Sequence, residues 1–226
     1  MNSKVIDTLA HMVAIPTVSH RPLNALASYL AERAEQSGFR VHRFETSPGK
    51  TNVVALAGPE RPGGLVLSGH MDVVPVSGQD WSSDPFLLRE SEGRLHGRGT
   101  CDMKGFIAAV VEAADPTLLS RLKRPLALIW THDEEVGCLG SAALQGQVAA
   151  LPHPLPDLAW IGEPTNFQVC NLHPGHVRVD VHCTGIPAHS SRPKLGLSAI
   201  LLARGVIEAF EILQLELESE QAFESQ

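Results

Sequence analysis

The stretch LVLSGHMD, residues 65–72, shows the pattern from which the fold can be predicted, an apolar run followed at once by His70 and Asp72. Carboxylates stand in similar surroundings in three later segments, about a strand plus a helix apart. These segments are residues 99–105 (GTCDMKG), 132–137 (HDEEVG) and 161–165 (IGEPT). Short apolar runs bounded by turn residues are typical of buried strands. The sequence therefore predicts strands that end in side chains able to bind a metal.

Helical patterns alternate with these strands. Apolar side chains recur at helical spacing in residues 3–14 and 22–37, and Gly38 is a typical stop after the second helix. This alternation predicts an α/β fold with a mainly parallel central sheet and helices on both faces. Strands are expected at residues 40–45, 52–57, 65–68, 125–130 and 158–161, and a hairpin at 86–96. A further helix is expected directly after Asp102, which would cap that helix, and another at residues 141–150.

The carboxyl ends of the strands form the reactive edge of such a sheet. His70, Glu134, Glu135 and Glu163 all follow predicted strands. The fold alone therefore gives a reason to bring these side chains together.

The pattern changes near residue 174. Residues 176–184 alternate apolar and polar side chains, as expected of a strand with one wet face. An amphipathic helix is predicted at residues 197–213. We therefore expect a domain at residues 1–174 and the start of a second, α+β domain at residues 175–226, too small to bury its own faces.

Composition excludes several classes of protein. The formal charge is −7 and no run of Lys or Arg exceeds two residues, which argues against a nucleic-acid partner. No apolar run approaches the ~18 residues of a membrane span, and the N-terminal segment becomes charged too early for a signal peptide. The four cysteines lack Cys-x-x-Cys spacing. They are expected to be reduced, mostly buried thiols in a cytoplasmic protein.

The clustered residue types suit a two-metal hydrolytic centre. Such a centre needs a carboxylate that bridges two ions, further imidazole and carboxylate ligands, and a free base near the attacking water. His70 and Glu163 are candidate ligands, Asp102 is the candidate bridge, and Asp72 can orient the His70 imidazole. In the pair Glu134-Glu135, one carboxylate can bind metal while the other faces the water. Mixed imidazole and carboxylate ligation favours zinc, cobalt or manganese.

Each of these residues also has an ordinary structural explanation when it is considered alone. Asp102 could simply cap a helix, Glu134-Glu135 could be a solvated loop pair, and Glu163 before Pro164 could be a turn residue. The metal hypothesis is stronger because all the candidates fall at one edge of the predicted sheet. Six other histidines are interpreted as structural: His11, His20, His42, His96, His132 and His153.

The longer motifs resemble a known family. Residues 68–75 (SGHMDVVP), 81–86 (WSSDPF), 97–106, 133–140 and 162–165 resemble the M20 metallopeptidases along essentially the whole chain. DMKGF at 102–106, DEEVGCLG at 133–140 and IGEPT at 161–165 are most similar to its acetylornithine deacetylase branch. The resemblance implies a zinc-exopeptidase-like catalytic domain followed by a lid and dimerisation domain.

The resemblance also implies roles for individual residues. Asp102 would bridge two divalent ions, zinc or cobalt, with His70 and Glu163 on one ion and Glu135 on the other. Glu134 would be the general base and Asp72 would orient His70. His189 would reach the other subunit's site and polarise the scissile carbonyl, and the bond from Asp102 to Met103 would be cis. A homodimer acting on a small N-acyl amino acid is implied for the full-length protein.

Several possibilities stay open from the sequence. The favoured reaction is removal of the acetyl group from Nα-acetylornithine in arginine biosynthesis. An N-acetylcitrulline deacetylase, a succinyl-diaminopimelate desuccinylase and a carboxypeptidase are alternatives within the family. Because members of the family run longer and supply a last histidine ligand beyond this length, a truncated homologue that binds metal or a partner without catalysis is a further alternative.

Overall fold

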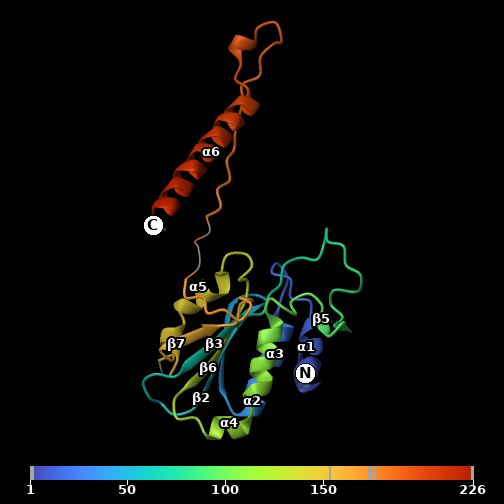
Figure 1. Cartoon of the computed structure of the whole chain (residues 1–226), viewed down its shortest axis with the longest axis vertical. Helices are drawn as coiled ribbons and strands as arrows, with labels where there is room; N and C mark the ends of the chain where they lie inside the picture. Colours follow the sequence, from blue (N-terminus) through green and yellow to red (C-terminus); the bar gives the residue numbers. More distant parts are fainter. Residues whose placement is uncertain (1–2, 153, 173–174, 176, 225–226) are drawn as a thin grey trace. The chain divides into compact units, whose positions relative to one another are not determined.

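The computed structural model describes residues 3–152, 154–172, 175 and 177–224, with backbone alone for residues 220–224. It divides into two units, Met1–Val169 and Cys170–Gln226 (Figure 1). The division falls close to the boundary expected near residue 174, which itself lies outside the described residues.

A five-stranded sheet forms the centre of the first unit, in the order β1-β2-β6-β3-β7. The strands are β1 (Arg40–Ser47), β2 (Lys50–Ala57), β3 (Leu65–His70), β6 (Leu126–Thr131) and β7 (Leu158–Ile161). Strands β6, β3 and β7 are parallel, whereas β2 runs antiparallel to both β1 and β6. The predicted α/β class is thus confirmed, and the parallel part of the sheet is the part that carries His70, Glu134 and Glu163.

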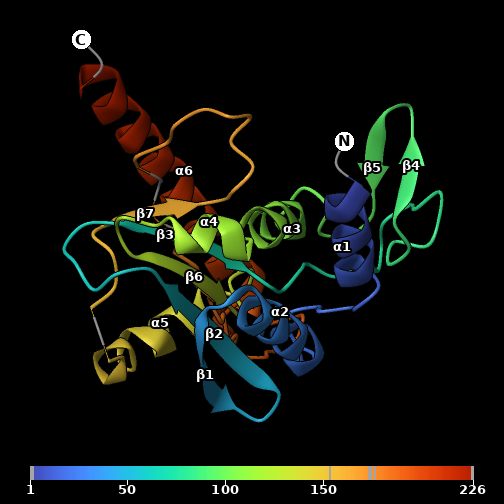
Figure 2. The same cartoon turned by 90° about the horizontal axis from the view of Figure 1, so that it is seen from below.

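Helices cover both faces of this sheet, as Figure 2 shows. The helices of the first unit are α1 (Ser3–Val13), α2 (Asn24–Ser37), α3 (Lys104–Ala113), α4 (Pro116–Ser120) and α5 (Leu139–Gln145), with a 3-10 turn η1 (Val148–Ala150). Helix α2 ends where expected, since Gly38 adopts a φ of 102°. The helix predicted at residues 141–150 is divided into α5 and η1.

Alternate residues of each strand enter two separate cores. Val53 of β2 and Trp130 of β6 join the larger core, which includes side chains of α1, α2 and α3. Val54 of β2 and Ile129 of β6 join a smaller core with Leu144 of α5. Since side chains alternate between the faces of a sheet, this pattern explains why β2 and β6 are apolar along most of their length.

A separate hairpin lies outside the main sheet. Strands β4 (Arg89–Ser91) and β5 (Arg94–His96) pair antiparallel around Glu92 and Gly93. The predicted turn is therefore confirmed, although the first strand begins at Arg89 where the sequence pattern placed its end.

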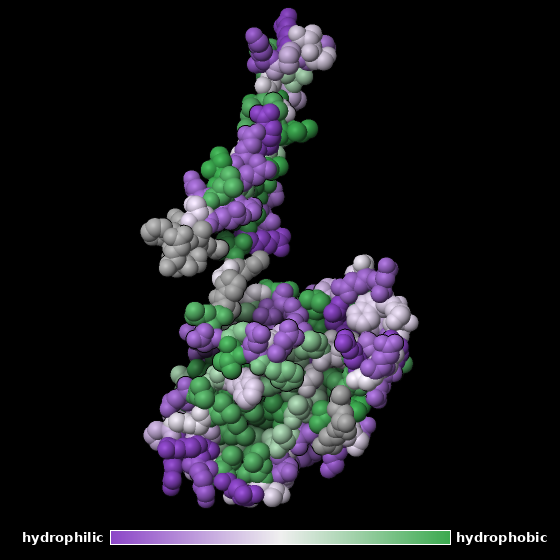
Figure 3. Space-filling view, viewed as in Figure 1, coloured by the Kyte–Doolittle hydropathy of each residue, from purple (hydrophilic) through white to green (hydrophobic). Residues whose placement is uncertain are grey.

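The second unit contains a 3-10 turn η2 (Pro193–Leu195), the helix α6 (Ala199–Glu224) and an isolated bridge between Ile186 and Leu197. The strand predicted at residues 176–184 is wrong for the described residues 177–184, which have no ladder partner. A strand needs a neighbouring strand to bond its main chain, and the described residues offer it none. Figure 3 shows hydrophobic side chains on the visible face of α6, many of them exposed.

Asn52 joins the main sheet to α5 and leads to a stability prediction. Its fully buried side chain donates to the Gly140 carbonyl at 2.8 Å and accepts the His132 amide at 3.1 Å. Asn52→Ala leaves both main-chain groups buried without these partners, at about 1–3 kcal/mol each. We expect urea denaturation to show the free energy of unfolding reduced by about 2–6 kcal/mol.

The neighbouring Thr51 provides the control for this measurement. Its hydroxyl donates to the Asn24 side chain at 3.1 Å in a less buried position. Thr51→Ala should cost about 1 kcal/mol or less. Equal losses for the two variants would contradict the role given to Asn52.

Candidate metal centre

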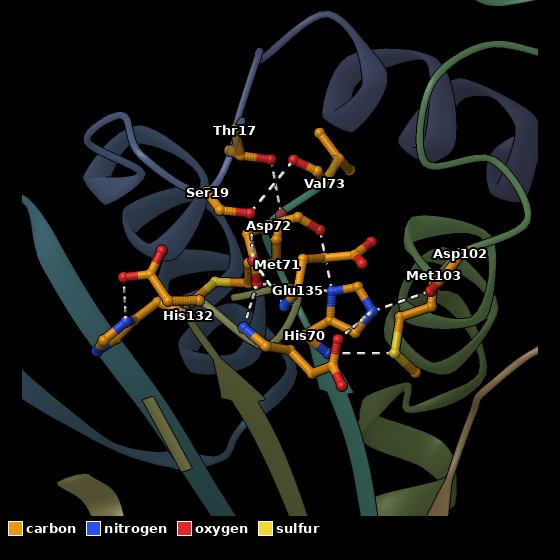
Figure 4. A network of polar contacts seen from close by, with 12 residues as sticks. Thr17, Ser19, His70, Met71, Asp72, Val73, Asp102, Met103, His132 and Glu135 are labelled. Atoms are coloured by element: carbon orange, nitrogen blue, oxygen red, sulfur yellow. Dashed lines mark hydrogen bonds and ion pairs between the residues drawn. The ribbon is translucent and has the colours of Figure 1, made fainter. Parts of the chain in front are cut away.

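His70 stands at the end of β3 and is almost fully buried. Its Nδ1 donates to the main-chain carbonyl of Asp72 at 2.9 Å, and its Nε2 lies 2.9 Å from Oδ1 of Asp102 (Figure 4). A carbonyl oxygen can only accept, so Nδ1 carries a hydrogen. The Nε2 atom is thereby aimed at the carboxylates, as metal-binding imidazoles usually are.

Asp72 is a wholly buried carboxylate that connects three segments of the chain. It accepts the Ser19 hydroxyl at 2.8 Å and the main-chain amides of Glu134 at 3.0 Å and Glu135 at 3.2 Å. Burial acts to raise the pKa of Asp72, but the hydrogen bonds from His70, Glu134 and Ser19 outweigh it and lower that pKa. Asp72 is therefore an ionised anchor for both His70 and the Glu134-Glu135 backbone.

Asp102 belongs to the cluster of polar side chains around His70 Nε2 and does not cap α3. The helix begins at Lys104, and its N-cap residue is Met103, which makes no side-chain capping hydrogen bond, so the predicted cap is wrong. The bond between Asp102 and Met103 is cis, as the family resemblance implied. The hydrogen bond from His70 lowers the pKa of Asp102. The carboxylate is used at the cluster, which is why it is unavailable to the helix.

Three glutamates complete the group. Glu134 Oε2 lies 3.9 Å and Glu163 Oε1 lies 3.8 Å from Nε2 of His70. Burial raises the pKa of Glu135. Burial, with the nearby charges of Asp102 and Glu134, raises the pKa of Glu163 to about 7. Burial is the main cause of both raised pKa values, and the neighbouring carboxylates add to it; a bound cation would offset both effects.

Ligand atoms of His70, Asp102 and Glu135 all lie within 4.8 Å of one another. Glu163 adds a third carboxylate beside the same imidazole. One imidazole with several carboxylates is a donor set that zinc, cobalt and manganese accept. The residues present therefore fit a divalent metal.

Protons compete with metal at this cluster, which gives a pH prediction. Burial acts to lower the pKa of His70, but the hydrogen bonds to Asp102 and Asp72 raise it to about 11. A metal must displace this proton, so affinity should rise with pH, and more steeply below pH 7, where Glu163 is also protonated. Zn²⁺ titration calorimetry at pH 6, 7 and 8, in buffers of different ionisation enthalpy, should show proton release. Affinity independent of pH would contradict this competition.

Comparison with known proteins places the chain in a family. Residues 66–220 match the model described as peptidase family M20/M25/M40. The chain belongs to this family. Acetylornithine deacetylases of Proteus mirabilis and Pasteurella multocida are 37% and 40% identical to it, over 89% and 84% of the chain. These alignments cover 54% and 51% of the two relatives, so the M20 chain spans about half their length.

Solved structures of other proteins have a similar fold. Human carnosine dipeptidase 1 is 27% identical, with a TM-score of 0.56 over 64% of this chain and 35% of that one. A tripeptidase from Staphylococcus aureus is 20% identical, with a TM-score of 0.64 over 91% of this chain and 56% of that one. The second similarity shows the fold alone.

His189 and the cysteines are not among the predicted metal ligands, although the Cys138 thiol donates to Oε1 of Glu134 at 3.6 Å. His189 is in the second unit, where its Nδ1 accepts the Ser191 amide at 3.2 Å, and its role toward a substrate carbonyl stays a prediction. The expected burial of the thiols is wrong. Cys101, Cys138 and Cys170 are exposed and Cys183 is partly exposed. The first two lie in loops and the others in the second unit, where little is buried.

Several residues around the site were not predicted from the sequence. Ser19 bonds Asp72, Lys50 bonds Asp133 at 2.6 Å, and His132, interpreted as structural, bonds Asp133 at 3.0 Å. The position of Asp133 directly before the paired glutamates was the one available indication. Nothing in the local sequence of Lys50 points to the site.

Proposed function

We propose that this M20 chain carries the metal centre of an amide hydrolase that removes the acetyl group from Nα-acetylornithine, a step of arginine biosynthesis. The main support is the convergence of His70, Asp102, Glu135 and Glu163 in a chain 37–40% identical to acetylornithine deacetylases. The chemistry requires a polarised acyl carbonyl, an activated water and an acid for the leaving amine.

We assign two divalent ions, zinc or cobalt, to the cluster. Asp102 would bridge them, His70 and Glu163 would hold one, and Glu135 would hold the other. When bound, such ions polarise a carbonyl and acidify water. The geometry supports this arrangement because Oδ1 of Asp102 lies 2.9 Å and Oε1 of Glu163 lies 3.8 Å from Nε2 of His70.

Glu134 is the proposed general base. Its main-chain amide is held on Asp72 at 3.0 Å, which leaves its carboxylate beside the cluster, 3.9 Å from His70 Nε2. This carboxylate takes a proton from the attacking water and later donates it to the amine nitrogen as the amide C–N bond breaks. Acetate and the free α-amine of ornithine are the products.

The remaining residues orient the reacting groups. Asp72 holds His70 with Nε2 facing the cluster, through its carbonyl and its carboxylate. His189 is proposed to donate to the acyl oxygen as negative charge develops there. A homodimer that supplies His189 across subunits, and a cytoplasmic location, belong to the same proposal. None of the helices in the described part of the chain combines the length and the hydrophobicity of a membrane span.

Substrate hydrolysis tests the proposal. The protein is supplied with Zn²⁺ or Co²⁺ and offered Nα-acetylornithine, Nα-acetylcitrulline, N-succinyl-diaminopimelate and a dipeptide, with amine release as the measurement. Preference for Nα-acetylornithine is expected. Preference for another of these compounds would contradict the substrate and leave amide hydrolysis intact, whereas no metal-dependent hydrolysis of any compound would contradict the function.

A further inference from the structure

A second polar network is built around Asp133, the residue before the paired glutamates Glu134 and Glu135. Asp133 directly precedes them and adopts a φ of 52°, in the left-handed region that few residues other than glycine occupy. Its buried carboxylate is held on both oxygens. Oδ1 lies 2.6 Å from the Lys50 ammonium, and Oδ2 lies 3.0 Å from Nδ1 of His132. Such a backbone conformation persists only where the surrounding contacts maintain it.

Lys50 connects this network to the opposite side of the cluster. Besides Asp133, its ammonium donates to the main-chain carbonyl of Ser19. The Ser19 hydroxyl donates to Asp72 at 2.8 Å, and Asp72 accepts the amides of Glu134 and Glu135. The contacts therefore form a closed ring, from Lys50 through Asp133 and its neighbours to Asp72, and back through Ser19.

Lys50 lies at the tip of the β1–β2 hairpin, and this position brings it into the ring. The strands are joined by Pro48 and Gly49, and Gly49 has a φ of 83°, as the third position of a type II turn requires. The Gly49 carbonyl also accepts the Leu23 amide at 3.0 Å, which anchors the tip next to α2.

The same hairpin holds His132. The pairing register shifts between Glu45 and Ser47, at Thr46, and a bulge of this kind can redirect a side chain. The Thr46 hydroxyl lies 2.7 Å from Nε2 of His132. The hairpin therefore contacts the His132–Asp133 segment at two points, through Thr46 and through Lys50.

Charge and burial make Lys50 the central member of the ring. The side chains of Lys50 and Asp133 are 14% and 9% exposed. A buried carboxylate that loses its cation is strongly unfavourable and rearranges to reach water. Loss of the Lys50 charge should therefore make the backbone of Glu134 and Glu135 more mobile. It should also weaken the contact between Ser19 and Asp72.

We propose that Lys50 is a positioning residue for the hydrolytic centre. Through Asp133 it fixes the backbone that presents the base Glu134 and the ligand Glu135, and through Ser19 it fixes Asp72, which orients His70. Lys50 itself touches none of the predicted metal ligands among its described contacts. This inference rests on the proposed function, because it assigns a task to Lys50 in that same centre.

The test compares Lys50→Met with a matched control, Arg33→Met. Arg33 and Glu112 form another partly buried ion pair, also at 2.6 Å, that joins α2 and α3 away from the cluster. Two readouts are made on the 226-residue chain. One is hydrogen exchange of the Glu134 and Glu135 amides by NMR without metal, and the other is Co²⁺ affinity with its visible absorption spectrum.

Lys50→Met should speed exchange of both amides about tenfold or more and weaken Co²⁺ binding by about 10–100-fold, the usual effect of losing a partner outside the ligand shell. The Co²⁺ bands should change as the ligand geometry loosens. Arg33→Met should leave both readouts within about twofold, although its thermal midpoint falls.

A double substitution separates positioning from simple loss of packing. Lys50→Met combined with Asp133→Asn removes the unpaired charge as well as the cation, and should recover part of the lost Co²⁺ affinity. Lys50→Gln, which keeps an uncharged donor, serves if the methionine variant does not fold. It should show the same losses to a smaller extent.

The outcomes distinguish this proposal from the proposed function. Unchanged amide exchange and Co²⁺ binding in a folded Lys50→Met or Lys50→Gln chain would overturn the positioning role and leave the metal centre standing. Failure of the unaltered chain to bind Co²⁺ would instead contradict the metal centre. Amide exchange then still decides whether Lys50 holds the Glu134-Glu135 backbone.

Discussion

Replacing Glu134 by glutamine should reduce kcat on Nα-acetylornithine by about 10²–10⁴-fold, the usual contribution of a general base. Glutamine keeps the shape of the side chain but cannot take a proton from water. The main-chain amide of residue 134 can still bond Asp72, so the backbone should remain in place. Metal affinity should change little, because Glu134 is not among the proposed ligands. Steady-state kinetics on the metal-loaded protein, with metal content measured in parallel, checks both expectations.

The adjacent glutamate provides the comparison for this experiment. Glu135→Gln makes the same carboxylate-to-amide change at the next residue, whose carboxylate can bind a metal together with His70 and Asp102. It should lower metal affinity, and activity should fall with occupancy. If Glu134→Gln lost metal while Glu135→Gln retained it, the two roles would have to be exchanged. Unchanged kcat in Glu134→Gln would exclude Glu134 as the base.

His70→Ala should weaken Co²⁺ binding by more than the ~10–100-fold expected of changes outside the ligand shell. The substitution removes the imidazole among the proposed ligands and leaves Asp102 without its closest described partner. It also removes the group that Asp72 orients. Co²⁺ titration followed by absorption spectroscopy measures the loss, and circular dichroism shows whether the chain is still folded.

His11→Ala is the control for the histidine substitution. His11 is an exposed residue of α1, and its ring packs beside Tyr29 with centroids 4.3 Å apart. Its removal should leave Co²⁺ binding unchanged. A folded His70→Ala chain that binds Co²⁺ as tightly as the His11→Ala chain would show that the metal centre has been placed wrongly.

The reactive edge could be predicted because it depends on short-range patterns. Strand periodicity located β3, β6 and β7, and parallel strands bring their carboxyl ends to one edge. His70, Glu134 and Glu163 follow from that rule. Asp102 was predicted to cap a helix because an aspartate before a helix usually bonds its first amides. This prediction was wrong. Here a hydrogen bond with His70, 32 residues away, uses that carboxylate instead.

Lys50 could not be predicted for a related reason. A lysine beside Pro48 and Gly49 looks like part of a solvated turn. Its burial depends on Ser19, 31 residues away, and on Asp133, 83 residues away, and these contacts exist only once the sheet has formed. The strand predicted for the alternating residues 177–184 was wrong for the opposite reason. Their local pattern is typical of a strand, but a strand also needs a neighbour to pair with.

The position of β7 at the end of the sheet has a consequence for how the cluster comes apart. Strand β7 pairs with β3 alone, and its side chains are exposed, including Leu158, Trp160 and Ile161. Figure 3 shows hydrophobic side chains on this part of the first unit. Weakly packed edge segments open locally at lower free energy than central strands. Glu163 follows this edge strand, whereas His70 follows β3, which is hydrogen-bonded to a strand on each side. Under mild denaturant the cluster should come apart in steps, with the Glu163 side detaching while His70 and Asp102 stay assembled.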